Sequence, residues 1–136
     1  MLNQKIENGK NVSPLLDKTI KNFLIDIDGT ICEDIPNEEP WRMIEAKVFE
    51  GSRDQVNKWY DDGHLITFFT SRTDEHREIT KEWLKNNNFK YHNLLMNKPR
   101  GGNYIWVDNH IVKGVRYKGV WSDLKPKLKT VHIFEE

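Results

Sequence analysis

Residues 23–30, FLIDIDGT, decide the fold that this sequence predicts. The apolar half of the stretch stops abruptly at acidic residues and a glycine, a pattern typical of a strand that is buried on both faces and ends at a site. Asp26 and Asp28 follow the strand directly, and residues two apart in an extended segment point to the same side. We therefore expect two carboxylates in one patch, beside a tight turn at Gly29 and the hydroxyl of Thr30.

Two carboxylates in one patch favour a bound cation, and Mg²⁺ suits this patch. It prefers oxygen ligands and commonly takes one or two carboxylates together with waters and phosphate oxygens. Asp108, at the end of a later apolar run, is the natural further ligand, so the expected metal set is Asp26, Asp28 and Asp108. Thr70 offers a hydroxyl and a backbone amide to a phosphate, and Lys98 offers a positive charge. Thr70 also has a plainer interpretation as a helix cap, and Lys98 as an ordinary loop lysine.

The rest of the chain alternates predicted strands with predicted helices. Further strands are expected at residues 65–69, 92–96 and 104–107, and helices at residues 53–62, with Ser52 as a plausible N-cap, and 74–86. Such alternation predicts a parallel sheet with helices on both faces and a site at the carboxyl ends of the strands. The expected fold is therefore a three-layer, Rossmann-like α/β domain.

A chain of 136 residues is long enough for one domain with a hydrophobic core and too short for two of ordinary size. Residues 1–17 are rich in Asn and Lys without a clean period, and we interpret them as a loose N-terminal arm. Residues 18–136 are then one domain. Within it, residues 31–50 carry prolines and acids and are expected to form a flap or hairpin.

Composition narrows the possible partners. Lys plus Arg equals Asp plus Glu, at 21 each, so nothing in the net charge favours nucleic acid or an anionic membrane as a partner. There is no apolar run of about 18 residues, which argues against a membrane span. Cys32 is the single cysteine and excludes an intrachain disulfide, which fits a cytoplasmic location.

The stretch FLIDIDGT resembles the first motif of the haloacid dehalogenase superfamily of phosphatases. The other motifs follow in order: LITFFT at residues 65–70 resembles the second, Lys98 stands where the third-motif lysine is expected, and IWVDN at residues 105–109 resembles the fourth, metal-binding motif. The resemblance spans residues 23–111. It implies a Mg²⁺-dependent phosphatase that passes through a phosphoaspartate.

The resemblance also implies roles for individual residues. Asp26 would be the nucleophile, Asp28 the general acid and then base, and Lys98 the group that stabilises developing charge, with Thr70 completing the catalytic set. The expected substrate-binding residues are Thr30, Ser71, Arg72 and Arg100, although surface arginines are common. The fourth motif often has a second acidic residue, whereas Asn109 follows Asp108 here, which predicts weaker or altered metal binding.

Both gaps where this superfamily inserts cap domains are small here, so the resemblance is to capless members such as the 3-deoxy-octulosonate 8-phosphate phosphatases. That resemblance implies a small phosphorylated sugar as substrate. It also makes a homo-oligomer, a dimer or tetramer, attractive as the means of closing the site, with Trp41, Trp121 or the N-terminal arm at the contact.

Three alternatives remain open at this point. The first is a non-catalytic or regulatory domain of the same fold, favoured by Asn109 and the missing cap. The second is a nucleotide or nucleic-acid end phosphatase, which the absence of a basic stripe with interleaved aromatics makes less favoured. The third is a mutase, although mutases of this superfamily have a sizeable cap to hold their intermediate.

Overall fold

The computed structural model describes residues 5–122 as a mixed α/β fold built on a small parallel sheet. The sheet contains β3 (Asn22–Ile25), β4 (Leu65–Phe69) and β5 (Asn93–Leu95), in the order β3-β4-β5. Both neighbouring pairs are parallel, with Phe23 opposite Ile66 and Phe68 opposite Leu94. The three strands confirm the predictions from the apolar runs, and their carboxyl ends lie at one edge of the sheet.

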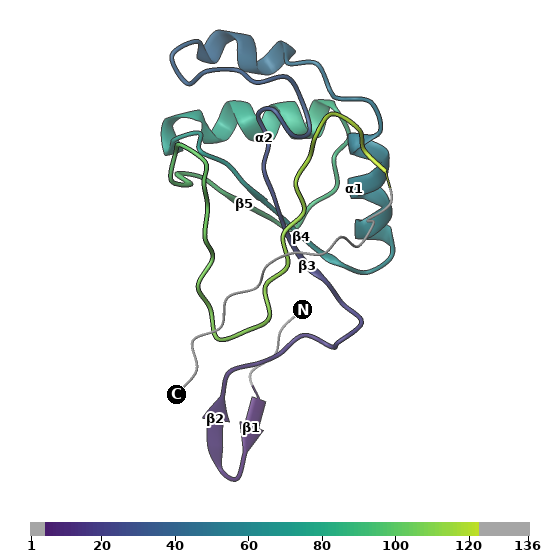
Figure 1. Cartoon of the computed structure of the whole chain (residues 1–136), viewed down its shortest axis with the longest axis vertical. Helices are drawn as coiled ribbons and strands as arrows, with labels where there is room; N and C mark the ends of the chain where they lie inside the picture. The colour runs from purple at the N-terminus through teal and green to yellow at the C-terminus, as the bar shows by residue number, and fades with distance from the viewer. Residues whose placement is uncertain (1–4, 123–136) are drawn as a thin grey trace.

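Two helices flank the sheet, α1 (Ser52–Asp61) and α2 (Arg77–Asn86), as predicted, and a short 3-10 turn, η2 (Asp74–His76), leads into α2. α1 packs against β4, and α2 packs against a further 3-10 helix, η1 (Pro40–Glu45), within the predicted flap (Figure 1). The N-cap of α1 is Gly51, with φ of +82°, and not Ser52. The buried Ser52 hydroxyl instead donates to the carbonyls of Ile31 and Phe49. These hydrogen bonds attach the start of α1 to the loop after β3 and to the segment just before the helix.

The core lies between the sheet, α2 and the flap. Trp83 of α2 is completely buried, and its indole N–H donates to the carbonyl of Ala46 at 2.9 Å. Its ring also stacks on Phe89, with centroids 5.5 Å apart. Full burial of a large apolar side chain contributes about 1.5–3 kcal/mol, so Trp83 is a principal link between α2 and the flap.

The strand expected at residues 104–107 is not formed. This segment is irregular, and its apolar side chains are exposed, Ile105 by 88% and Val107 by 69%. An apolar run forms a strand only where a neighbouring strand supplies hydrogen bonds and another layer covers its side chains. Among residues 5–122, neither is supplied to this segment, so the described sheet has three strands and not the four predicted.

A hairpin precedes the sheet, formed by β1 (Lys5–Glu7) and β2 (Lys10–Val12). The predicted N-terminal arm therefore contains a hairpin at these residues. Asn8 and Gly9 both have positive φ, of +51° and +73°, as the two central residues of a type I′ turn require. An Asn-Gly pair such as Asn8-Gly9 is a recognised sequence signal for a hairpin. Figure 1 shows the hairpin away from the sheet.

The division into an arm of residues 1–17 and a domain of residues 18–136 stays a prediction, and its outer ends lie outside the described residues. Within residues 5–122, no helix is long and apolar enough to cross a membrane.

Candidate active site

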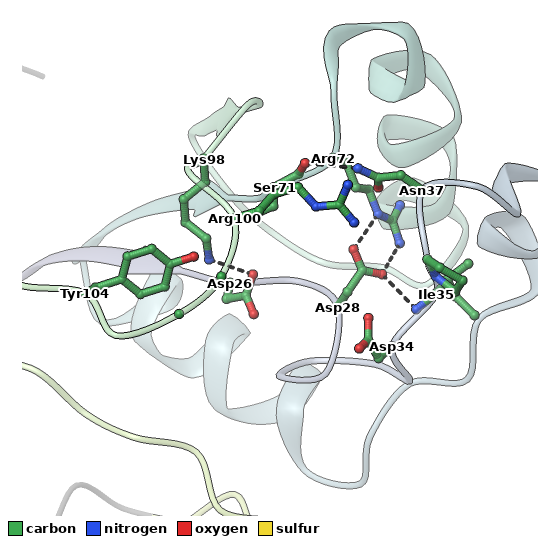
Figure 2. Close-up of a pocket in the computed structure, with 13 residues that line it drawn as sticks. Asp26, Asp28, Asp34, Ile35, Asn37, Ser71, Arg72, Lys98, Arg100 and Tyr104 are labelled. Carbon is green, nitrogen blue, oxygen red and sulfur yellow. Dashed lines mark hydrogen bonds and ion pairs between the residues drawn. The ribbon is translucent and has the colours of Figure 1, made fainter.

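A cleft of about 360 Å³ lies where β3 and β4 end (Figure 2). Parallel strands that end together leave their following loops at one edge, so residues distant in sequence meet there. Of the residues predicted to form the site, six line this cleft: Asp26, Asp28, Ser71, Arg72, Lys98 and Arg100. Thr30, Thr70 and Asp108 do not.

Asp26 is held by two donors, one on each carboxylate oxygen. The Lys98 ammonium donates to Oδ1 at 2.8 Å, and the Thr30 hydroxyl donates to Oδ2 at 3.0 Å. The Asp26 side chain remains 36% exposed, whereas Lys98 is only 14% exposed. The backbone N–H of Lys98 donates to the carbonyl of Thr70, which attaches its loop to the end of β4. Asp26 is thus oriented from both sides and still open to the cleft.

Asp28 is held in a different way, by a planar fork. Arg72 donates to both of its carboxylate oxygens, from Nε and Nη2, each at 2.8 Å. The remaining guanidinium nitrogen, Nη1, donates to the Thr80 hydroxyl at 3.0 Å. The Arg72 side chain is completely buried. Two parallel charged hydrogen bonds in a buried place are the strongest form of this pairing.

The structure gives Arg72 a partner within the protein, and its predicted contact with substrate stays a prediction. We expected it to bind substrate directly, because it follows the end of a strand beside the site. All three guanidinium nitrogens instead donate to side chains of the protein itself. Arg72 therefore fixes Asp28, and a substrate phosphate is not its first partner.

Thr70 lies at the end of β4 as predicted, yet it faces the protein interior. Its backbone N–H donates to the carbonyl of Leu95, and its buried hydroxyl accepts from the backbone N–H of Arg72. The amide expected for a phosphate is therefore already used. Ser71, the next residue, lines the cleft, where its hydroxyl donates to the carbonyl of Pro99 at the long distance of 3.5 Å.

Asp108 lies on an exposed loop outside the cleft. Its carboxylate accepts from the backbone N–H of His110 at 3.0 Å and from the indole of Trp106 at 3.1 Å. These contacts, first that of His110, lower the pKa of Asp108 from its ordinary value. Because the strand expected before it is not formed, Asp108 is not carried to the sheet edge, and the predicted set of three metal ligands is not assembled.

A divalent cation at this cleft would therefore depend on Asp26 and Asp28. In the part of the chain that the structure describes, no three His, Cys, Asp or Glu side chains are placed to share a metal ion. Two carboxylates still match the usual Mg²⁺ set, in which water and phosphate oxygens complete the coordination. The donor chemistry fits Mg²⁺, with fewer protein ligands than the sequence predicted.

Three cleft residues with polar side chains were missed in the sequence: Asp34, Asn37 and Tyr104. The Tyr104 ring lies 5.4 Å from the Lys98 ammonium, which is also 5.9 Å from the ring of Phe69. Asn37 donates to the carbonyl of Ser71 at 3.2 Å and so connects the flap to the end of β4. The sequence could have indicated them only by their position, because Asp34 and Asn37 lie in the flap after the first strand and Tyr104 follows the glycine-rich loop after Lys98. Both segments start at the same edge of the sheet.

Arg100 lines the cleft from this glycine-rich loop and is the most open of its cations. Its guanidinium lies 3.7 Å from Glu38 of the flap, with 63% of the side chain exposed. Exposed pairs of this kind contribute little to stability, so Arg100 can exchange Glu38 for an incoming anion at low cost. The cleft therefore presents the carboxylates of Asp26 and Asp28 beside the inner ammonium of Lys98, with the exposed guanidinium of Arg100 at its edge.

Comparisons with known proteins bear on the family and the fold of this chain. The sequence model of a family described as PITM 1-3, LNS2 domain matches residues 23–115. A crystal structure of a target protein from Vibrio cholerae is similar, with a TM-score of 0.51 and 20% identity over 65% of this chain and 80% of that one. No curated protein matches the sequence.

A second solved structure, titled as the Pnkp1/Rnl/Hen1 complex, has a TM-score of 0.53 and 22% identity over 68% of this chain. The match spans only 32% of that chain, about a third of its length. Likenesses at this level of identity bear on the fold alone. They confirm the predicted α/β fold with a parallel sheet.

Proposed function

Because the chain belongs to the family described as PITM 1-3, LNS2 domain, which has the fold of haloacid-dehalogenase-like phosphatases, we propose that it is a magnesium-dependent phosphomonoester hydrolase. The proposed reaction passes through a phosphoaspartate on Asp26. The observation that carries this proposal is the placement of Asp26, which is oriented on both oxygens by Lys98 and Thr30 and remains open to the cleft.

In the first step, a carboxylate oxygen of Asp26 attacks the phosphorus of the substrate. The bond from phosphorus to the ester oxygen breaks, and Asp28 relays a proton from the phosphate group of the substrate to the departing alcohol. Lys98 lies at the attacking carboxylate, where its charge offsets the repulsion between two anions that must approach each other.

In the second step, Asp28 takes a proton from water, and the water oxygen attacks the phosphorus of the phosphoaspartate. The bond to Asp26 breaks, Asp28 passes its proton to the departing phosphate, and both residues return to their starting states. The fork from Arg72 keeps Asp28 facing the cleft through both steps, because it holds both oxygens at 2.8 Å. Each oxygen retains a further lone pair for the proton.

Asp26 and Asp28 would hold Mg²⁺, together with oxygens from water and the substrate phosphate. When bound, the ion supplies positive charge between the nucleophile and the phosphate, which lowers the cost of bringing two anions together.

A small phosphorylated sugar remains our proposed substrate. The cleft of about 360 Å³ suits a small molecule, and Asn37, Ser71 and Arg100 offer polar groups to hydroxyls and phosphate. The cleft is open, so we propose that a second copy of the chain covers it in a dimer or tetramer. Trp41, which is 67% exposed on η1, is available for that contact.

A second candidate is a domain that binds a phosphorylated ligand without hydrolysing it. The observation that favours it is the position of Asp108, which lies outside the cleft, so that only two of the three predicted metal ligands, Asp26 and Asp28, line it. Such a domain would use the same cations, Lys98 and Arg100, to hold a phosphate.

Phosphate release separates the two candidates. Wild type and Asp26→Asn are assayed with a panel of sugar phosphates, nucleotides and para-nitrophenyl phosphate, with Mg²⁺ or with EDTA. Hydrolysis predicts release that needs Mg²⁺ and is abolished in Asp26→Asn. The binding candidate predicts no release from wild type, together with heat of binding for a phosphorylated compound in calorimetry. Asp61→Asn gives a matched control, because it makes the same change on α1 and Asp61 does not line the cleft.

A further inference from the structure

The chain after the cleft runs through solvent and then returns to the body of the protein. Residues 99–116 are exposed throughout, whereas Tyr117 and Trp121 are partly buried. Tyr117 stacks on Phe49, with centroids 5.7 Å apart, and Trp121 lies 5.6 Å from Tyr117 and 6.1 Å from Trp59. We call Phe49, Trp59, Tyr117 and Trp121 the aromatic clasp. Figure 1 shows the returning chain beside α1.

Trp121 does more than pack within this clasp, because it has a polar link to the loop of the nucleophile. Its indole N–H donates to the backbone carbonyl of Thr30 at 2.8 Å. The hydroxyl of the same Thr30 donates to Oδ2 of Asp26 at 3.0 Å. Trp121, Thr30 and Asp26 therefore form a chain of two hydrogen bonds that joins the returning segment to the proposed nucleophile.

The sequence around the clasp allows this close approach. A Cβ built on Gly51 would lie 3.2 Å from the Cβ of Trp121, and Gly51 has φ of +82°. Any larger residue there would push Trp121 away from Thr30. Trp121 of the returning chain thus contacts both Gly51 at the start of α1 and Thr30 in the loop after β3.

We propose that Trp121 is a positioning residue for Asp26, and this inference rests on the phosphatase function proposed above. Gly29, with φ of +78°, allows a tight turn before Thr30. Trp121 fixes the end of this turn through its hydrogen bond to the carbonyl of Thr30. The direction of Oδ2 on Asp26 then depends on where Thr30 sits. Attack on phosphorus requires close alignment, and a displacement of about 1 Å at the reacting group costs on the order of a hundredfold in rate.

The kinetic test compares two conservative changes in the same clasp. Trp121→Phe keeps an aromatic ring and removes the indole donor, while Trp59→Phe trims a ring that stacks on Phe23 and lies 6.1 Å from the ring of Trp121. With para-nitrophenyl phosphate and Mg²⁺, we expect Trp121→Phe to lower kcat about fivefold, with KM within about twofold of wild type. Trp59→Phe should keep kcat within about twofold. Equal loss of kcat in both variants, or a change in KM alone, would overturn the proposal.

A second measurement does not depend on turnover. The indole N–H resonance of Trp121, identified by its loss in Trp121→Phe, should shift in Asp26→Asn, because that change alters the acceptor at the other end of the chain of hydrogen bonds. An unchanged resonance and exchange rate would refute the link even if the protein hydrolyses phosphate esters. A shifted resonance in a protein that releases no phosphate would retain the link and refute the proposed function.

Discussion

The fork between Arg72 and Asp28 gives a prediction whose size follows from its geometry. Replacing Arg72 by Met keeps much of the side-chain volume and removes three hydrogen bonds that Arg72 donates. Two of them, each of 2.8 Å, are to the carboxylate of Asp28. Arg72 is completely buried and the Asp28 side chain is only 15% exposed, so the carboxylate is left with little water to replace its partner. Removing one partner of a buried pair costs about 3–5 kcal/mol, and we expect about 3 kcal/mol here because Asp28 keeps some exposure.

The assay is urea unfolding of wild type, Arg72→Met, Asp28→Asn and the double variant, analysed as a double-mutant cycle. The account predicts that the double variant is less destabilised than the sum of the single variants, by about 2 kcal/mol, since the second change removes a charge that is already unpaired. Losses that add to within about 0.5 kcal/mol would refute the reasoning and leave Arg72 as an independent group.

Three further outcomes are expected. Lys98→Met should lower the rate of Mg²⁺-dependent phosphate release on the order of a hundredfold, because it removes the charge beside Asp26, and stopped assays with para-nitrophenyl phosphate measure this. Burial, followed by the charge of Asp28, raises the pKa of the Cys32 thiol from 9.0 to about 12. The thiol therefore ionises at lower pH in the unfolded state, so the free energy of unfolding should fall as pH rises from about 9 towards about 12. Urea unfolding of Cys32→Ala should show a smaller fall over that range. Asp108→Asn should leave Mg²⁺ affinity in calorimetry within about twofold of wild type, because Asp108 lies outside the cleft, and a tenfold loss would restore the role that the sequence predicted.

Much of the sheet could be predicted because its signals are local. β3 and β4 are apolar runs that stop at polar residues, and such runs are short enough to exclude a helix. The same rule failed at residues 104–107, where an equally apolar run stays exposed. A strand depends on a partner that is distant in sequence, and no local pattern reports whether that partner is reached.

The site shows the same division. The acidic pair at Asp26 and Asp28 was evident from a spacing of two, and both residues do line one cleft. Which cation belongs to which carboxylate was not evident, because Arg72 is 44 residues from Asp28 and Lys98 is 72 residues from Asp26. Both cations were identified as site residues, but the burial that turns Arg72 into a fixed partner appears only when the fold is built.

The claim that matters most is that Asp26 becomes phosphorylated during turnover. The direct measurement is rapid acid quenching of the protein with para-nitrophenyl phosphate and Mg²⁺, followed by mass spectrometry of the peptide that contains Asp26. The account predicts a phosphate on that carboxylate in wild type within the first turnovers and none in Asp26→Asn. Steady release of phosphate with no modified peptide, or with the phosphate on a different residue, would contradict it.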